Sequence, residues 1–150
     1  MKYATNPNRL IRTKACLVYD ILCNKEKYIE EGNKYKSKEK DCFYCTVIGD
    51  LKALKYKIKN NKNLLNSKDK LERSLLYLAA RNGYYDLTEY LLKKGINVNE
   101  VQKNGSTALH GAAFYGQKLI IQLLIDHGID TTIKNEFGHT AAEEAKNSSY

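Results

Sequence analysis

Apolar and small residues recur with a long fixed period along the second half of the chain. A shift of 33 residues aligns the segment that starts at Glu72 with the one that starts at Gly105, ERSLLYLAARNGYYDLTEYLLKKGINVN with GSTALHGAAFYGQKLIIQLLIDHGIDTT. A second shift of 33 aligns GHTAAEEAK, which starts at Gly138. Upstream, CTVIGDLKALKYKI followed by NLLNSKDKL is a degenerate copy with a shortened turn at Gly49. Such a period predicts a stack of repeated supersecondary units.

Each unit is predicted to contain two short antiparallel helices and a hairpin loop. Thr107 is a suitable N-cap for the first helix, and Gly116 supplies the positive φ that turns the chain into the second. The second helix carries a buried stripe at i, i+3 and i+4 spacing. In the two complete units this stripe consists of Leu87, Tyr90 and Leu91, and of Ile120, Leu123 and Leu124.

These residues resemble the ankyrin repeat family, whose T-P-L-H-x-A signature is similar to TALHGA, which starts at Thr107. The resemblance covers about residues 40–146. It implies an all-α ankyrin-repeat solenoid of stacked helix-turn-helix units with short hairpin loops. The expected repeats are 40–71, 72–104, 105–137 and a partial copy at 138–150, after an N-terminal helical extension at 1–39. The sequence departs from the family's proline at Leu75, Ala108 and Ala141, and from its histidine at Tyr77 and Glu143. Each lost proline costs about 0.4 to 1 kcal/mol of stability.

The stretch GSTALHGAAFYG is the first place to look for chemistry, because it combines a hydroxyl, a histidine and glycines. Thr107 and His110 have no third orienting group in sequence reach, and no phosphate-binding glycine pattern is present. In the family, the histidine at the position of His110 hydrogen-bonds within and between repeats. We therefore expect no catalytic residue and no cofactor.

The cysteines allow a metal or redox interpretation. Cys42 and Cys45 form a C-x-x-C, which Cys16 and Cys23 could complete as a four-thiolate zinc site. The spacing of the second pair fits neither a zinc knuckle nor a zinc ribbon, and Cys42 and Cys45 fall where small residues pack between repeats. Buried free thiols without a metal are the preferred interpretation.

The segment before the repeats predicts one helix. Asn6 and Pro7 start it, and an apolar face extends through Leu22 to the region of Cys23. This face either packs on the first repeat as an N-terminal cap, which we favour together with a monomer, or forms a dimerising or partner-binding surface.

Stacked repeats present a continuous surface that usually binds another macromolecule, so we expect an unidentified protein partner. By resemblance to the family, contacts come from the hairpin tips and the exposed edge of each first helix. The candidate residues are Lys70, Leu71, Arg73, Arg81, Asn82, Lys103, Asn104, Ser106, Phe114, Tyr115, Glu136, Phe137 and His139. Phe114 and Tyr115 could instead pack within the repeats.

The formal net charge is +8, and the excess of basic residues lies in residues 1–71, which contain 17 Lys and Arg and 8 Asp and Glu. Lys52, Lys55, Lys59 and Lys62 fall near one side of the second helix of the degenerate repeat, which raises the alternative of a surface for nucleic acid or acidic lipid. A run of lysines without arginine is usually a solvated face, so we expect no dedicated ligand and disfavour nucleic acid.

The chain lacks an apolar run long enough to span a membrane and lacks the pattern of a secretory signal, so we expect an intracellular, cytoplasmic protein. An enzymatic role would require that the chain be part of a longer protein whose chemistry lies beyond Tyr150.

Overall fold

The computed structural model describes residues 41–147, and we make no structural statement about residues 1–40 and 148–150. Within the described range the elements, in chain order, are α3 (Cys42–Ile48), α4 (Leu51–Asn60), the 3-10 helix η1 (Lys62–Asn66), α5 (Leu75–Asn82), α6 (Tyr85–Lys93), α7 (Ala108–Phe114), α8 (Lys118–Asp126) and α9 (Ala141–Asn147). The only β-type pairing among these residues is an isolated bridge between Lys68 and Ser74. The predicted all-α fold is confirmed.

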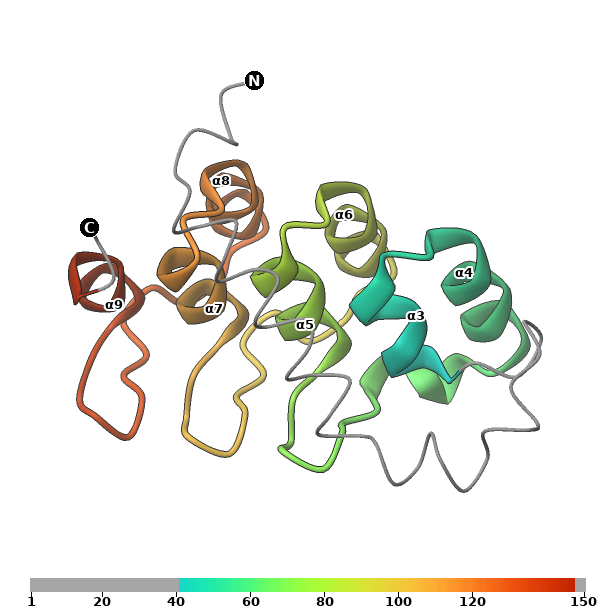
Figure 1. The fold of residues 1–150 in the computed structure, drawn as a ribbon, viewed down its shortest axis with the longest axis horizontal. Helices are drawn as coiled ribbons and strands as arrows, with labels where there is room; N and C mark the ends of the chain where they lie inside the picture. Colours follow the sequence, from blue (N-terminus) through green and yellow to red (C-terminus); the bar gives the residue numbers. More distant parts are fainter. Residues whose placement is uncertain (1–40, 148–150) are drawn as a thin grey trace.

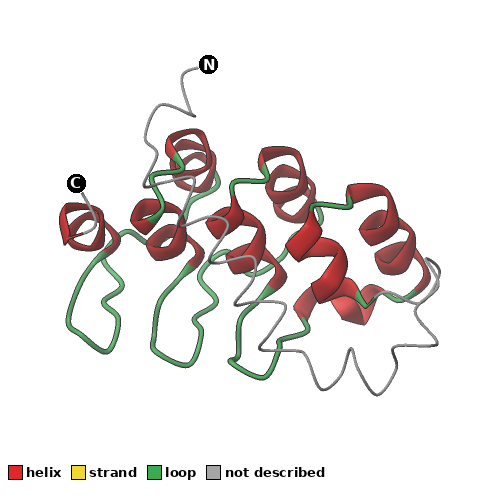
Figure 2. Cartoon of the chain, in the orientation of Figure 1, coloured by secondary structure: helices red, strands yellow, loops and turns green. Residues whose placement is uncertain are grey.

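The helices form two rows with hairpin loops below them. Figure 1 shows α3, α5, α7 and α9 side by side in one row and α4, α6 and α8 in a second row. We call these the inner row and the outer row. The hairpin loops that precede α5, α7 and α9 all project to the same side of the inner row (Figure 2). The array is therefore a short solenoid of repeated units, as the period predicts.

Capping residues and glycines set the limits of the inner helices. The side chain of Asp41 accepts a hydrogen bond from the Tyr44 N–H (2.7 Å), and that of Ser74 accepts one from the Tyr77 N–H (3.1 Å). Gly49 and Gly83 end α3 and α5 in the left-handed region, with φ of 77° and 82°. The inner helices have similar lengths, with 7 residues in α3 and α7 and 8 in α5.

The inner row forms the centre of the core. All 8 residues of α5 are buried, because α5 lies between α3 and α7. Ala79 and Ala80 are completely buried, and their small side chains let neighbouring helices approach closely. Cys45 and Thr46 occupy the matching place in α3 and are equally buried.

The outer helices bury one stripe each. Leu87 and Leu91 of α6 are buried, as are Ile120, Leu123 and Leu124 of α8, whereas Tyr90 is only half-buried. The predicted stripe is thus confirmed except at Tyr90, which lies at its edge. The predicted N-terminal helix and its role as a cap fall outside the described residues, so the division at residue 39 stays a prediction.

The hairpins repeat one hydrogen-bond pattern and are joined to one another. In each, the same backbone N–H donates to the carbonyl four residues later: Asp69 to Arg73 (3.1 Å), Gln102 to Ser106 (3.0 Å) and Asn135 to His139 (3.0 Å). Between hairpins, the Lys103 N–H donates to the Leu71 carbonyl (3.2 Å), and the Glu136 N–H donates to the Asn104 carbonyl (2.8 Å). These bonds hold the hairpins in one register along the array.

Candidate functional site

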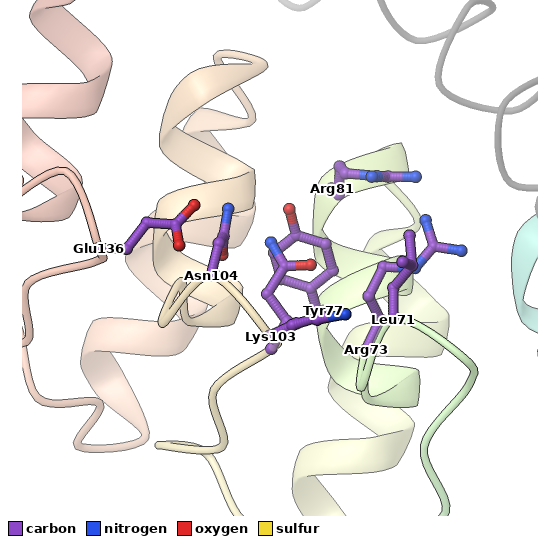
Figure 3. Close-up of a pocket in the computed structure, with 8 residues that line it drawn as sticks. Leu71, Arg73, Tyr77, Arg81, Lys103, Asn104 and Glu136 are labelled. Carbon is purple, nitrogen blue, oxygen red and sulfur yellow. The ribbon is translucent and has the colours of Figure 1, made fainter.

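Two adjoining cavities lie where the hairpins meet the inner helices. The first has a volume of about 420 Å³, and it is bordered by six predicted residues, Leu71, Arg73, Arg81, Lys103, Asn104 and Glu136 (Figure 3). The second has a volume of about 200 Å³, and five predicted residues border it, Asn104, Ser106, Phe114, Tyr115 and Phe137. The fold therefore brings together most of the candidate residues, although they come from three different hairpins and two helices.

Three candidates lie apart from these cavities. Lys70 and His139 belong to hairpins and Asn82 to the end of α5, and none of them borders either cavity. His139 Nδ1 is 3.1 Å from the Glu144 carboxylate. Its ring therefore has an internal partner.

The candidates differ in how far their side chains are exposed to a partner. Lys103, Glu136 and Phe137 are exposed, and the exposed fraction of Phe137 reaches 66%. Four others, predicted to lie at hairpin tips or at the exposed edge of a first helix, are buried: Arg73, Arg81, Asn82 and Ser106.

Arg73 is buried because it forms an ion pair inside its own hairpin. Its Nε and Nη2 atoms are both 2.7 Å from Oδ2 of Asp69, and both side chains are 1% exposed. The second carboxylate oxygen of Asp69 accepts the backbone N–H groups of Leu71 and Arg73. This ion pair holds the hairpin in shape and keeps the Arg73 side chain buried beside the first cavity.

Tyr77 is the main cavity residue that sequence reasoning missed. Its ring borders both cavities, and the guanidinium of Arg81 lies over it, 5.5 Å from the ring centroid. A side chain added at Gly111 would come within 3.1 Å of this ring, so the glycine leaves room for it. Tyr77 stands where the family has histidine, and that departure is the sequence signal that could have identified it.

Aromatic side chains border the second cavity. Phe114 and Tyr115 pack edge to face with ring centroids 5.0 Å apart, and both are half-buried. They therefore contact each other and still expose part of their surface beside Phe137. Such rings offer large apolar contact area at little cost in conformational entropy.

His110 has an architectural role. The Thr107 N–H donates to His110 Nδ1 (3.1 Å), so Nε2 carries the proton and donates to the His139 carbonyl (2.9 Å) in the next hairpin. Both ring nitrogens of this buried side chain are thereby engaged. His110 bonds within its repeat and to the following one, as the resemblance implies.

The C-x-x-C motif consists of two buried cysteines that form no disulfide. Burial raises the pKa of Cys45 to about 11, which keeps its thiol protonated and poorly nucleophilic. Among residues 41–147, no cluster of three or more His, Cys, Asp or Glu side chains could hold a metal ion. Cys16 and Cys23 lie outside this range.

No helix within the described range combines the length and the apolar character that a bilayer-spanning segment needs.

Comparison of the sequence with known proteins identifies the repeats. Residues 42–135 match the family model for ankyrin repeats, described as three copies. The chain is 35% identical over 82 residues to alpha-latrotoxin-Lg1a of Latrodectus geometricus, which covers 53% of this chain and 6% of the toxin. It is 33% identical over 97 residues to the E3 ubiquitin-protein ligase hecd-1 of Caenorhabditis elegans, covering 65% of this chain and 4% of the ligase.

A third relative is the human NAD-capped RNA hydrolase NUDT12, which is 36% identical over 83 residues, or 55% of this chain and 18% of the hydrolase. The match therefore spans only a small part of each of these three relatives. Ankyrin repeats are generally protein-interaction modules, and the fold itself is non-catalytic. From the family match, the stacked helix pairs and the shared hairpin pattern, it follows that this chain belongs to the ankyrin repeat family.

Proposed function

We propose that this chain binds a partner protein through the hairpin side of its inner row. The observation that carries the proposal is the pair of adjoining cavities, which share Tyr77 and Asn104 and collect candidate residues from successive repeats. Protein-binding sites need such a continuous surface, with apolar anchors near the centre and charges at the rim.

The second cavity is lined by aromatic side chains and the first has charged side chains at its edge, and this difference indicates which residues a partner segment would carry. The second cavity offers Phe114, Tyr115 and the exposed Phe137 to an apolar or aromatic side chain. The first places the exposed Lys103 and Glu136 at its edge, where charged groups fix orientation and the rate of encounter. The partner segment therefore carries an apolar anchor next to polar or charged residues.

The test is affinity capture from a lysate of the source cells with matched variants. In the site variant, Tyr115→Ala and Phe137→Ala remove two cavity rings. In the control, Leu119→Ala and Ile125→Ala remove two apolar side chains of α8 that are 46% and 44% exposed. Arg81 stays unchanged, because its side chain is buried and its removal would disturb α5. Circular dichroism and urea unfolding establish that all three proteins are folded.

We expect a protein that is retained by the unaltered chain and by the α8 control but is recovered at least about tenfold less by the site variant, because truncated anchor residues commonly cost 2 kcal/mol or more of binding. Equal recovery by the site variant, or a loss confined to the α8 control, would contradict binding at the hairpin side.

A further inference from the structure

A third cavity, of about 630 Å³, lies away from the hairpins, between the outer helices α4 and α6 and the 3-10 helix η1. Four lysines from these three segments border it, Lys55, Lys59, Lys62 and Lys94. On α4, Lys55 and Lys59 are one helical turn apart, and Lys62 follows at the start of η1. Lys94 caps the C-terminal end of α6. A linear run of lysines in the sequence thus becomes a convergent cluster.

The positive charge of this cluster is not neutralised by the described part of the protein. Residues 51–65 contain five lysines and no aspartate or glutamate. None of the four cavity lysines forms an ion pair with a residue in 41–147, and the nearby carboxylate of Glu89 is engaged by Lys93 (2.7 Å). Like charges one turn apart on a helix destabilise it. A bound anion would remove this repulsion.

Two of the ammonium groups lie near the same aromatic ring of the cavity lining. Ile58 is buried, and Leu65 and Tyr90 are half-buried, so the floor is apolar. The Nζ atoms of Lys55 and Lys94 lie 5.3 Å and 5.7 Å from the centroid of the Tyr90 ring. Cation–π attraction to this one ring therefore holds a lysine of α4 and a lysine that caps α6 beside the cavity before any ligand arrives.

We propose that this cavity binds a compact anion with two or more phosphate groups. Lysine ammonium groups act as point charges for phosphate oxygens, and several of them suit several phosphates. The volume is that of a small-molecule site. Lys52 and Lys57 of the same helix do not border the cavity, so the four lysines form a local cluster rather than a continuous track for a polymer. The site lies on the outer row and does not depend on the proposed partner surface.

The test is titration calorimetry of the whole chain with sodium tripolyphosphate and with inositol hexakisphosphate. The site variant combines Lys55→Glu and Lys94→Glu. The control combines Lys52→Glu and Lys118→Glu, two exposed lysines outside the cavity, and so changes the net charge equally. Lys55→Gln with Lys94→Gln gives a milder variant if the glutamates prevent folding. We expect saturable binding that the site variant weakens at least about tenfold and that the control leaves within about twofold.

Two further arms identify the source of the phosphates. Flotation with phosphatidylcholine vesicles, with and without phosphatidylinositol bisphosphate, tests a lipid headgroup. Recruitment that requires the bisphosphate and Lys55 assigns the headgroup, whereas binding of the soluble anions without recruitment assigns a free ligand. The proposal is overturned by no measurable binding, by equal weakening in site and control variants, or by equal affinity for citrate. It is also overturned if duplex DNA binds and tripolyphosphate does not displace it.

Discussion

Glu72 occupies the hairpin position at which the next two repeats carry glycine. Its φ is 59°, close to the 79° of Gly105 and the 74° of Gly138. The reason for the positive φ is common to all three hairpins, since in each the residue's N–H donates to the carbonyl three residues earlier, on Asp69, Gln102 and Asn135. A side chain in this left-handed region costs about 1 to 2 kcal/mol. The hairpin before α5 therefore stores strain that the two later hairpins avoid.

Glu72→Gly is expected to raise the free energy of unfolding by about 0.5 to 1 kcal/mol, because relief of the left-handed strain exceeds the added entropy of the unfolded chain. The side chain of Glu72 is exposed, so little packing is lost. Gly138→Ala is the reverse experiment, since no atom lies within 4 Å of the added carbon and only strain is introduced. Urea unfolding measures both. A loss of stability in Glu72→Gly would show that the strain is not relieved.

A comparison of residues at the same position in successive repeats shows which side-chain roles could be predicted from the sequence. At the capping position, Glu143 accepts the Thr140 N–H (2.9 Å) as His110 accepts that of Thr107, so one departure from the family keeps the bond. Tyr77, the other departure, instead borders both cavities. The roles of Thr107 and His110 follow from the motif. The burial of Arg73 does not, because it depends on a hairpin that brings Asp69 back onto it.

At the scale of elements, neighbouring repeats are joined by one bridge made with different side chains. The residue before α6 and the residue before α8 each reach back to the inner helix of the previous repeat. The Tyr84 hydroxyl donates to the Val47 carbonyl (2.8 Å), and Gln117 Nε2 donates to the Arg81 carbonyl (3.2 Å). A side chain at Gly49 or Gly83 would come within 2.8 Å of these bridging groups. The glycines are therefore needed both for the turn and for space.

Removing this bridge should loosen one repeat from the next. Tyr84→Phe deletes only the hydroxyl and is expected to lower the free energy of unfolding by about 0.5 to 1.5 kcal/mol, because the Val47 carbonyl loses its donor. Tyr85→Phe is the matched control on the adjacent residue, whose side chain is 39% exposed, and should change stability by less than about 0.5 kcal/mol. Equal effects in urea unfolding would mean that the bridge contributes nothing.

Most helices, but not their connections, could be predicted from the sequence. Alanine pairs, i, i+3, i+4 stripes and glycines indicate the inner and outer helices. The 3-10 helix η1 was not predicted, because Asn61 follows α4 where α6 and α8 are followed by turns with glycine. The side-chain bridges between repeats could not be predicted either. Tyr84 and Gln117 are different residue types at one repeat position, and each reaches its carbonyl acceptor only once the repeats have stacked.

At the scale of the whole molecule, the two proposed binding surfaces lie on different rows of helices. The hairpin side of the inner row carries the two cavities proposed for a partner protein, and the outer row carries the lysine-lined cavity. Because repeats contact mainly their neighbours, substitutions on one row can leave the other intact. This separation makes the two proposals independent in experiment.

The most direct test of the account is hydrogen exchange of the whole chain, with and without the partner that affinity capture recovers. We predict that the partner slows exchange in the hairpins at 69–73 and 102–106 and in α5 and α7, while exchange in α4, α6 and α8 is unchanged. Slowed exchange confined to the outer helices, with the hairpins unaffected, would contradict a partner site on the hairpin side of the array.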